Sequence, residues 1–327
     1  MAAEPPLTEP PLIEPPFAAP PPSLPPAWPA WVIAGLGLIV VLAGAAWLFY
    51  AASLGASARD WLVPGVLTTG GAAGLLGGLG WLAVRGVWAR RHLPAERYRG
   101  PSIILMFFLA VAAANVLSLI PLLAAYAAGH DVLDPGPVAV TALLLVTPLV
   151  FGAVALFVLR TRALAGVRLG DGAKTARNLG RGLALGAVAW VLAATLAAAL
   201  GWVVKQLTGE EPVDNQLVAN LASTLPPLVA IGIIGILTPV AEELFFRWVA
   251  VNAWEREHGT RAAVIGSAVL FGVAHVSGGT LLVLPLIFLL GLALALAYVI
   301  TRSLPLVIAM HVAFNSLSLL VLFAVGV

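Results

Sequence analysis

The sequence contains no cysteine and very few charged residues. Without cysteine, the chain can form neither a disulfide framework nor a thiolate nucleophile or metal ligand. Charged residues make up 10% of the 327 positions and hydrophobic residues 61%, whereas a soluble globular domain has about 25% charged residues. The basic residues form no patch with interleaved aromatic side chains, so nothing in the sequence indicates nucleic-acid binding. This composition excludes an ordinary soluble domain.

Long apolar runs fill most of the chain and predict membrane-spanning helices. A helix needs about 20 apolar residues to cross the hydrocarbon core of a bilayer. After residue 29 the sequence has about nine apolar passes, near residues 30–54, 63–87, 101–127, 138–159, 182–204, 225–251, 261–276, 281–301 and 304–326. We therefore expect an all-α fold, a polytopic transmembrane helix bundle of about 8–9 spans.

Residues 1–29 form a separate tail with a proline pair every five residues. Proline lacks the backbone N–H that helices and sheets need, so this segment favours extended polyproline II and should be disordered. It has no basic region like that of a signal peptide, so we expect it to be retained. We interpret the tail as a semi-rigid spacer, with docking of a proline-recognising partner on residues 4–26 as the alternative.

The connections between the passes alternate in charge. Arginine and lysine gather after the second and fourth passes and around the end of the sixth, while acidic residues follow the third and fifth. Connections rich in Lys and Arg stay on the cytoplasmic side of a membrane. We predict an integral multi-pass protein of a bacterial plasma membrane, with the proline-rich tail in the cytoplasm.

Two adjacent carboxylates, Glu242 and Glu243, lie inside an apolar pass. Placing one such charge at the centre of a membrane helix costs about 2.5–3.5 kcal/mol on insertion scales. Neighbouring helical residues point about 100° apart, so the two glutamates face different surroundings. Glu243 shares a face with Arg247, which favours an ion pair and leaves Glu242 directed at a cavity. The alternative is that both glutamates pair with basic groups and only hold the bundle together.

A helical hairpin should bring His275 beside Glu242. His258-Gly259 is a helix stop, and Glu242 lies 16 residues before His258 while His275 lies 17 after it. Both arms rise about 1.5 Å per residue, so the two side chains should lie at one level. Phe271 shares the face of His275 and could wall the pocket. The following Ser277-Gly278-Gly279 predicts a break in the helix within the membrane.

The last pass adds His311 and Asn315, which are four residues apart and share a helix face. One histidine in a membrane helix is usually a core residue with its hydrogen bonds satisfied. Two histidines, an asparagine and two glutamates on three neighbouring helices indicate a functional site instead.

These residues fall into three patterns: Glu242-Glu243-Leu-Phe-Phe-Arg247, Phe271-Gly-Val-Ala-His275 and His311-Val-Ala-Phe-Asn315. In this order they resemble the EExxxR, FxxxH and HxxxN motifs of the CAAX-protease and bacteriocin-processing family of intramembrane endopeptidases. The resemblance covers residues 225–326, which we expect to form a peptidase-like helical core. Residues 30–205 would then be additional transmembrane helices.

The resemblance implies hydrolysis of a peptide or membrane-protein substrate at the cytoplasmic side of the bilayer, as in a CAAX prenyl protease or a bacteriocin-processing enzyme. It assigns Glu242 as general base and His275 as the residue that orients the water. His311 and Asn315 would bind the developing oxyanion, supported by Glu243, Arg247 and Phe271. We expect no cofactor; if zinc takes part, Glu242, His275 and His311 are its available ligands.

Two other functions remain open from the sequence. A non-proteolytic membrane scaffold or immunity protein could keep the same fold. A proton-coupled transporter would also place acids and histidines in the membrane, but the first half of the chain has no counterpart of the segment from Glu242 to Asn315. The substrate itself cannot be identified from these patterns.

Overall fold

The computed structural model of the chain describes residues 23–53, 62–130, 135–167, 174–209, 224–276 and 284–325. Within these ranges the secondary structure is helical, as predicted. The amino-terminal helices are α1 (Trp28–Ser53), α2 (Leu62–Arg90), α3 (Ile103–Ala127), α4 (Gly136–Arg160) and α5 (Thr175–Thr208). The proposed docking segment at 4–26 and the predicted break at Ser277–Gly279 lie wholly or mostly outside the described residues.

The second half of the chain is built around one long helix, Pro227–His258, which consists of five consecutive segments. They are α7 (Pro227–Ala230), η3 (Ile231–Leu237), α8 (Thr238–Glu243), η4 (Leu244–Val251) and α9 (Asn252–His258), where η3 and η4 are wider π-helical turns. Three helices follow: α10 (Thr260–Ala274), α11 (Leu284–Thr301) and α12 (Leu304–Val325).

Eight helices among the described residues are long and apolar enough to cross a membrane. Helix α10, with 15 residues, is shorter, and at about 1.5 Å per residue it is roughly 22 Å long. Its length is below the roughly 30 Å of a hydrocarbon core, so α10 by itself is shorter than a membrane span. The predicted bundle of about 8–9 spans is confirmed, and the chain is an integral multi-pass membrane protein.

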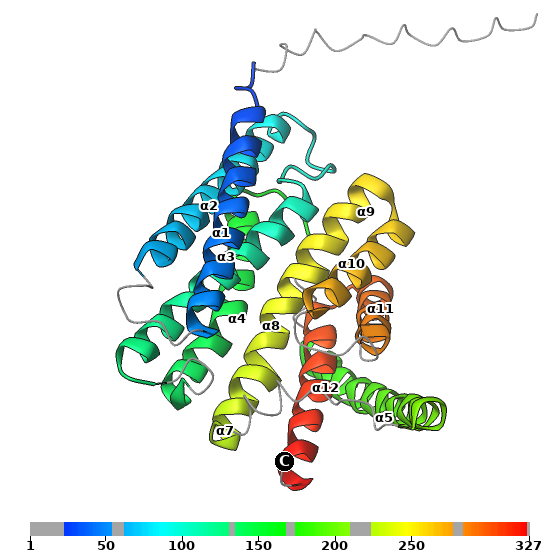
Figure 1. Cartoon of the computed structure of the whole chain (residues 1–327). Helices are drawn as coiled ribbons and strands as arrows, with labels where there is room; N and C mark the ends of the chain where they lie inside the picture. Colours follow the sequence, from blue (N-terminus) through cyan, green and yellow to red (C-terminus); the bar gives the residue numbers. More distant parts are fainter. Residues whose placement is uncertain are drawn as a thin grey trace, which may run out of the picture.

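Figure 1 shows the long helix through α8 crossing the middle of the bundle, with α1–α4 on one side and α10–α12 on the other. Two consecutive phenylalanines of the long helix pack against its neighbours on the two sides. The ring of Phe245 lies 5.0 Å from that of Phe151 in α4, and the ring of Phe246 lies 5.2 Å from that of Phe271 in α10. The Glu-Glu-Leu-Phe-Phe-Arg segment therefore supplies core packing on both sides as well as charge.

Glycines allow two other helix pairs to approach closely. A Cβ on Gly71 would lie 2.7 Å from the backbone nitrogen of Val41, so α1 and α2 are in backbone contact there. A Cβ on Gly186 of α5 would overlap the Met310 carbonyl oxygen, which places α5 directly against α12. Small residues permit such contacts in lipid, where helix association depends on packing.

The connections that carry arginine gather at one end of the bundle. Arg256 at the end of α9 donates to the carbonyls of Ala95 and Ala165, which lie in the connections after α2 and α4. Arg90 forms an ion pair of 2.8 Å with Glu257. The two sets of connections identified from charge alone therefore touch each other through α9, which agrees with the predicted topology.

Candidate active site

Proline 239 leaves backbone carbonyls of the long helix without their usual partner. In the wide turn η3 the Thr238 N–H donates to the Ile233 carbonyl, five residues back, and Pro239 has no N–H to continue the series. Helix α12 supplies the missing donors. Asn315 Nδ2 donates to the Ile234 carbonyl at 3.1 Å, and Ser316 Oγ donates to the Gly235 carbonyl at 3.4 Å. The helix that carries the glutamates is thereby tied to α12.

Glu243 is completely buried and is held by two basic side chains. Its Oε2 lies 3.2 Å from Arg247 Nε, and its Oε1 accepts a hydrogen bond of 2.9 Å from His311 Nδ1. Arg247, also fully buried, donates through Nη2 to the Gly291 carbonyl, and its guanidinium lies 4.7 Å from the centre of the Phe271 ring. A charge can stay buried where such partners compensate its desolvation. The predicted pairing of Glu243 with Arg247 is present.

Glu242 lies about 100° around the helix from Glu243 and faces both histidines. Its Oε1 lies 3.9 Å from His275 Nε2, and its Oε2 lies 3.7 Å from His311 Nε2. Both separations exceed the usual length of a hydrogen bond, about 3.2 Å at most for a nitrogen donor. They suit a water molecule that bridges the carboxylate and an imidazole. The hairpin count from the sequence therefore placed His275 correctly, at the level of Glu242.

The orientation of His275 is set by its own helix. Its Nδ1 donates to the Phe271 carbonyl at 2.8 Å, because a carbonyl oxygen can only accept. Nε2 is then the nitrogen that faces Glu242. The His275 side chain is 33% exposed, whereas those of Glu242 and His311 are 8% and 2% exposed. The cluster therefore meets its surroundings on the side of His275.

Phe271 contacts both imidazoles, as a wall of the site. Its ring centre lies 4.8 Å from that of His275 and 5.6 Å from that of His311. Together with the Arg247 guanidinium above its face, these contacts make Phe271 the apolar partition between the buried ion pair and the Glu242 side of the site.

His311 and Asn315 share a helix face, but they bond to different partners. His311 bonds to Glu243, and Asn315 bonds to the backbone of the long helix. Sequence reasoning did not include Ser316, which takes the second carbonyl. The signal was present in Pro239, because a proline inside a helix implies two backbone acceptors that need other donors.

A carboxylate and two imidazoles form a donor set that zinc accepts, and both imidazoles are oriented through Nδ1 as zinc-ligating histidines are. In the described part of the chain, however, no three His, Asp or Glu side chains are arranged closely enough to hold a metal ion. The three groups thus fit zinc in the chemistry of their donor atoms.

A charged cluster buried at the meeting point of membrane helices marks the candidate functional site of a membrane protein. The model of the family "Type II CAAX prenyl endopeptidase Rce1-like" matches residues 224–317 of the chain. This match confirms that residues 224–317 resemble the CAAX-protease and bacteriocin-processing family of intramembrane endopeptidases. No curated protein and no solved structure matches the chain.

The matched segment contains the glutamates, both histidines and Asn315, and it begins three residues before α7. Helices α1–α5 lie outside it. The catalytic roles assigned to single residues, the domain boundaries and the partners remain predictions.

Proposed function

We propose that the chain hydrolyses a peptide bond with a water molecule activated by Glu242. The observation that carries this proposal is the position of the Glu242 carboxylate between two imidazole nitrogens, at 3.9 and 3.7 Å. A water that donates one hydrogen to Glu242 and the other to His275 Nε2 presents a lone pair outward. That lone pair can attack a substrate carbonyl held on the open side of His275.

In the first step the water oxygen bonds to the carbonyl carbon and its proton passes to Glu242. The carbonyl oxygen takes the negative charge of the tetrahedral intermediate. In the second step the C–N bond breaks and the proton held by Glu242 passes to the leaving amine. General base and acid catalysis of this kind contributes about 10²–10⁴-fold to a rate.

His311 is the donor to the oxyanion in this mechanism. Its Nδ1 is occupied by Glu243, so it offers a donor at Nε2 when both nitrogens carry hydrogen. Asn315 can add its second amide hydrogen, since the first is used by the Ile234 carbonyl.

The substrate is a peptide or membrane protein that reaches the site from the cytoplasmic side, as in CAAX prenyl proteolysis. His311 lies seven residues into α12, about 11 Å from the arginine-bearing end at 1.5 Å per residue. That end would face the cytoplasm by the excess of arginine in its connections. A substrate terminus would therefore cross less than half of the bilayer to reach the site.

The Glu242→Gln variant tests the proposal. We expect hydrolysis of a farnesylated fluorogenic peptide by the purified chain in liposomes to fall by at least about 10²-fold. Glu257→Gln, which changes a carboxylate at the end of the same long helix, is the matched control and should keep the wild-type rate. Comparative proteomics of peptide termini extends the test to substrates without a prenyl group. A chain that is a scaffold or an immunity protein would give the same cellular termini with wild type and Glu242→Gln.

We propose the glutamate mechanism without a metal, because Glu242 and the two imidazoles beside it already supply a general base and hydrogen-bond donors for hydrolysis. Exhaustive chelation should leave the rate unchanged. One equivalent of zinc found by elemental analysis, with loss of activity on its removal, would assign Glu242, His275 and His311 as ligands instead.

A further inference from the structure

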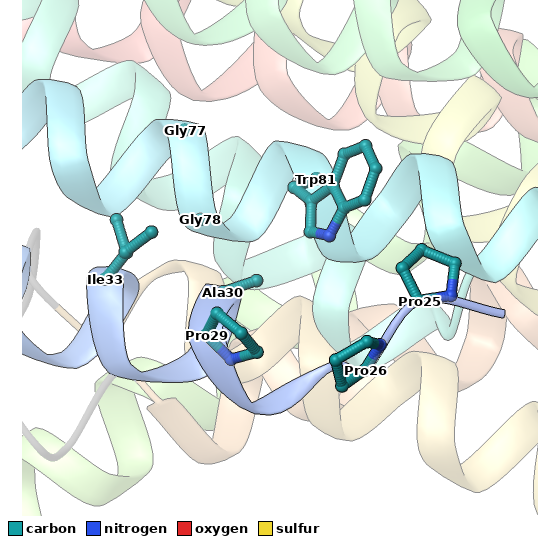
Figure 2. Close-up of a pocket in the computed structure, with 8 residues that line it drawn as sticks. All are labelled: Pro25, Pro26, Pro29, Ala30, Ile33, Gly77, Gly78 and Trp81. Atoms are coloured by element: carbon teal, nitrogen blue, oxygen red, sulfur yellow. The ribbon is translucent and has the colours of Figure 1, made fainter.

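An apolar groove far from the glutamates opens between the beginning of α1 and the second half of α2. Its volume is about 490 Å³, within the range of about 300–1,000 Å³ of small-molecule sites. Figure 2 shows one wall made by the rings of the prolines and the other by the indole of Trp81. The residues that matter here are Pro25, Pro26, Pro29, Gly77, Gly78 and Trp81.

The groove results from two glycines with different surroundings. A Cβ on Gly78 would lie 2.6 Å from the Ala30 carbonyl, so the helices touch there and close the floor. A Cβ on Gly77 would meet nothing within 4 Å, so this residue keeps the groove open. The prolines are held in place by Arg85, whose Nε donates to the Pro25 carbonyl at 2.9 Å.

The position of the groove in the bilayer limits its occupant. Both helices are membrane spans, and the groove lies near the end of α2 that leads to Arg90. Trp28 and Trp31 at the start of α1 are 67% and 57% exposed, which is typical of the aromatic belt at a membrane interface. An occupant therefore has an apolar part in the groove and a polar part at the interface.

The charge of Arg85 indicates the chemistry of the occupant's polar part. Arg85 lies one helical turn beyond Trp81, toward the interface, and among the described residues no carboxylate pairs with it. A cation beside an apolar groove at a membrane surface attracts an anionic lipid.

We propose that this groove binds one acyl chain of an anionic phospholipid, whose phosphate lies beside Arg85. The lipid occupies helices outside the peptidase-like segment, so the proposal does not depend on the peptidase activity.

Native mass spectrometry of the full chain, titrated with phosphatidylglycerol or phosphatidylcholine, tests this site. The wild type should retain one phosphatidylglycerol more tightly than any other lipid. Gly77→Leu fills open space and improves helix propensity, so it should fold and yet bind this lipid at least tenfold more weakly. Gly80→Leu is the matched control, because Gly80 is on the same helix, also faces open space and does not line the groove.

Arg85→Gln should weaken phosphatidylglycerol about fivefold more than phosphatidylcholine, because only phosphatidylglycerol loses a charge partner while both lipids share any change in the groove. The proposal is wrong if Gly77→Leu retains the lipid, if Gly80→Leu loses it equally, or if both lipids bind the wild type alike. A wild-type dimer that Gly77→Leu converts to a monomer, with lipid binding unchanged, would assign the groove to a second copy of the chain.

Discussion

The two halves of this bundle are held together by different physical means. Among the described residues before residue 224, Thr68 alone is a buried polar residue, and it donates to a carbonyl of its own helix. From residue 224 onward seven polar or charged residues are buried, among them Glu242, Glu243, Arg247 and His311. The first half packs glycine backbones against each other, and the second half organises charge.

This difference shows which helices depend on particular side chains and which depend only on a close fit. Apolar helices in lipid associate through shape, so α1 and α2 need only small residues at their contact. A buried ion pair costs desolvation and is retained when its geometry serves another purpose. The charge cluster therefore marks the half of the chain in which we propose that the chemistry takes place.

Removal of one charge from the buried cluster should have the largest effect on stability. Arg247→Met leaves Glu243 buried without its ion pair, which should lower the free energy of unfolding by about 3–5 kcal/mol. Titration with sodium dodecyl sulfate, followed by circular dichroism, measures this change. The double variant Glu243→Gln/Arg247→Met should recover most of the loss; a double variant as unstable as Arg247→Met would contradict the ion-pair explanation.

Overpacking of the glycine contacts should have an intermediate effect that differs between the halves. Gly71→Val and Gly186→Val each force a side chain into a neighbouring backbone, at a cost of about 1–3 kcal/mol. Only Gly186→Val should also reduce peptidase activity, at least tenfold, because it displaces α12 beside His311. Rates and melting midpoints of the same preparations test this.

Each of these variants has a neighbour that faces open space. Gly70→Val and Gly180→Val place the same side chain on the same helices without a contact, and both should behave as wild type. Equal loss of activity in Gly71→Val and Gly186→Val would mean that the two halves do not divide packing from catalysis as described.

The smallest effect is expected at the exposed ion pair of Arg302 with Glu255, where the two nitrogen–oxygen distances are 2.5 and 2.7 Å. The hydrogen bonds to Glu255 raise the pKa of Arg302. The Arg302 side chain is nevertheless 51% exposed, so Arg302→Gln should cost less than about 1 kcal/mol. High salt should lower wild-type stability toward that of the variant; a loss as large as that of Arg247→Met would show that exposure does not govern these pairs.

The sequence was sufficient for two relations that rest on residue spacing along one helix or across one turn. Helical phase separated Glu242 from Glu243, and the Gly259 stop aligned Glu242 with His275, since both arguments use only residue spacing. The rotation of α12 about its own axis depends on packing against several helices at once. For that reason the bonds of His311 to Glu243 and of Asn315 to Ile234 could not be derived from spacing.

The wide turns η3 and η4 were also beyond sequence reasoning, because α and π turns use the same kinds of residue. A sequence indicates such a turn only where a backbone donor is missing, as it is at Pro239. Asn252 fills a similar need in the second turn, where its Nδ2 donates to the Trp248 carbonyl at 2.8 Å and to the Tyr298 hydroxyl at 2.7 Å.

Wide turns of this kind have a consequence for how related chains should be aligned. A π turn holds one residue more than an α turn between the same two flanking segments. A homologue that lacks one residue between Ile231 and Leu237 can close an ordinary turn there and still direct its glutamate to the same histidines. A gap placed at this turn would therefore preserve the correspondence of every residue after Thr238, whereas a gap placed elsewhere in the helix would shift it.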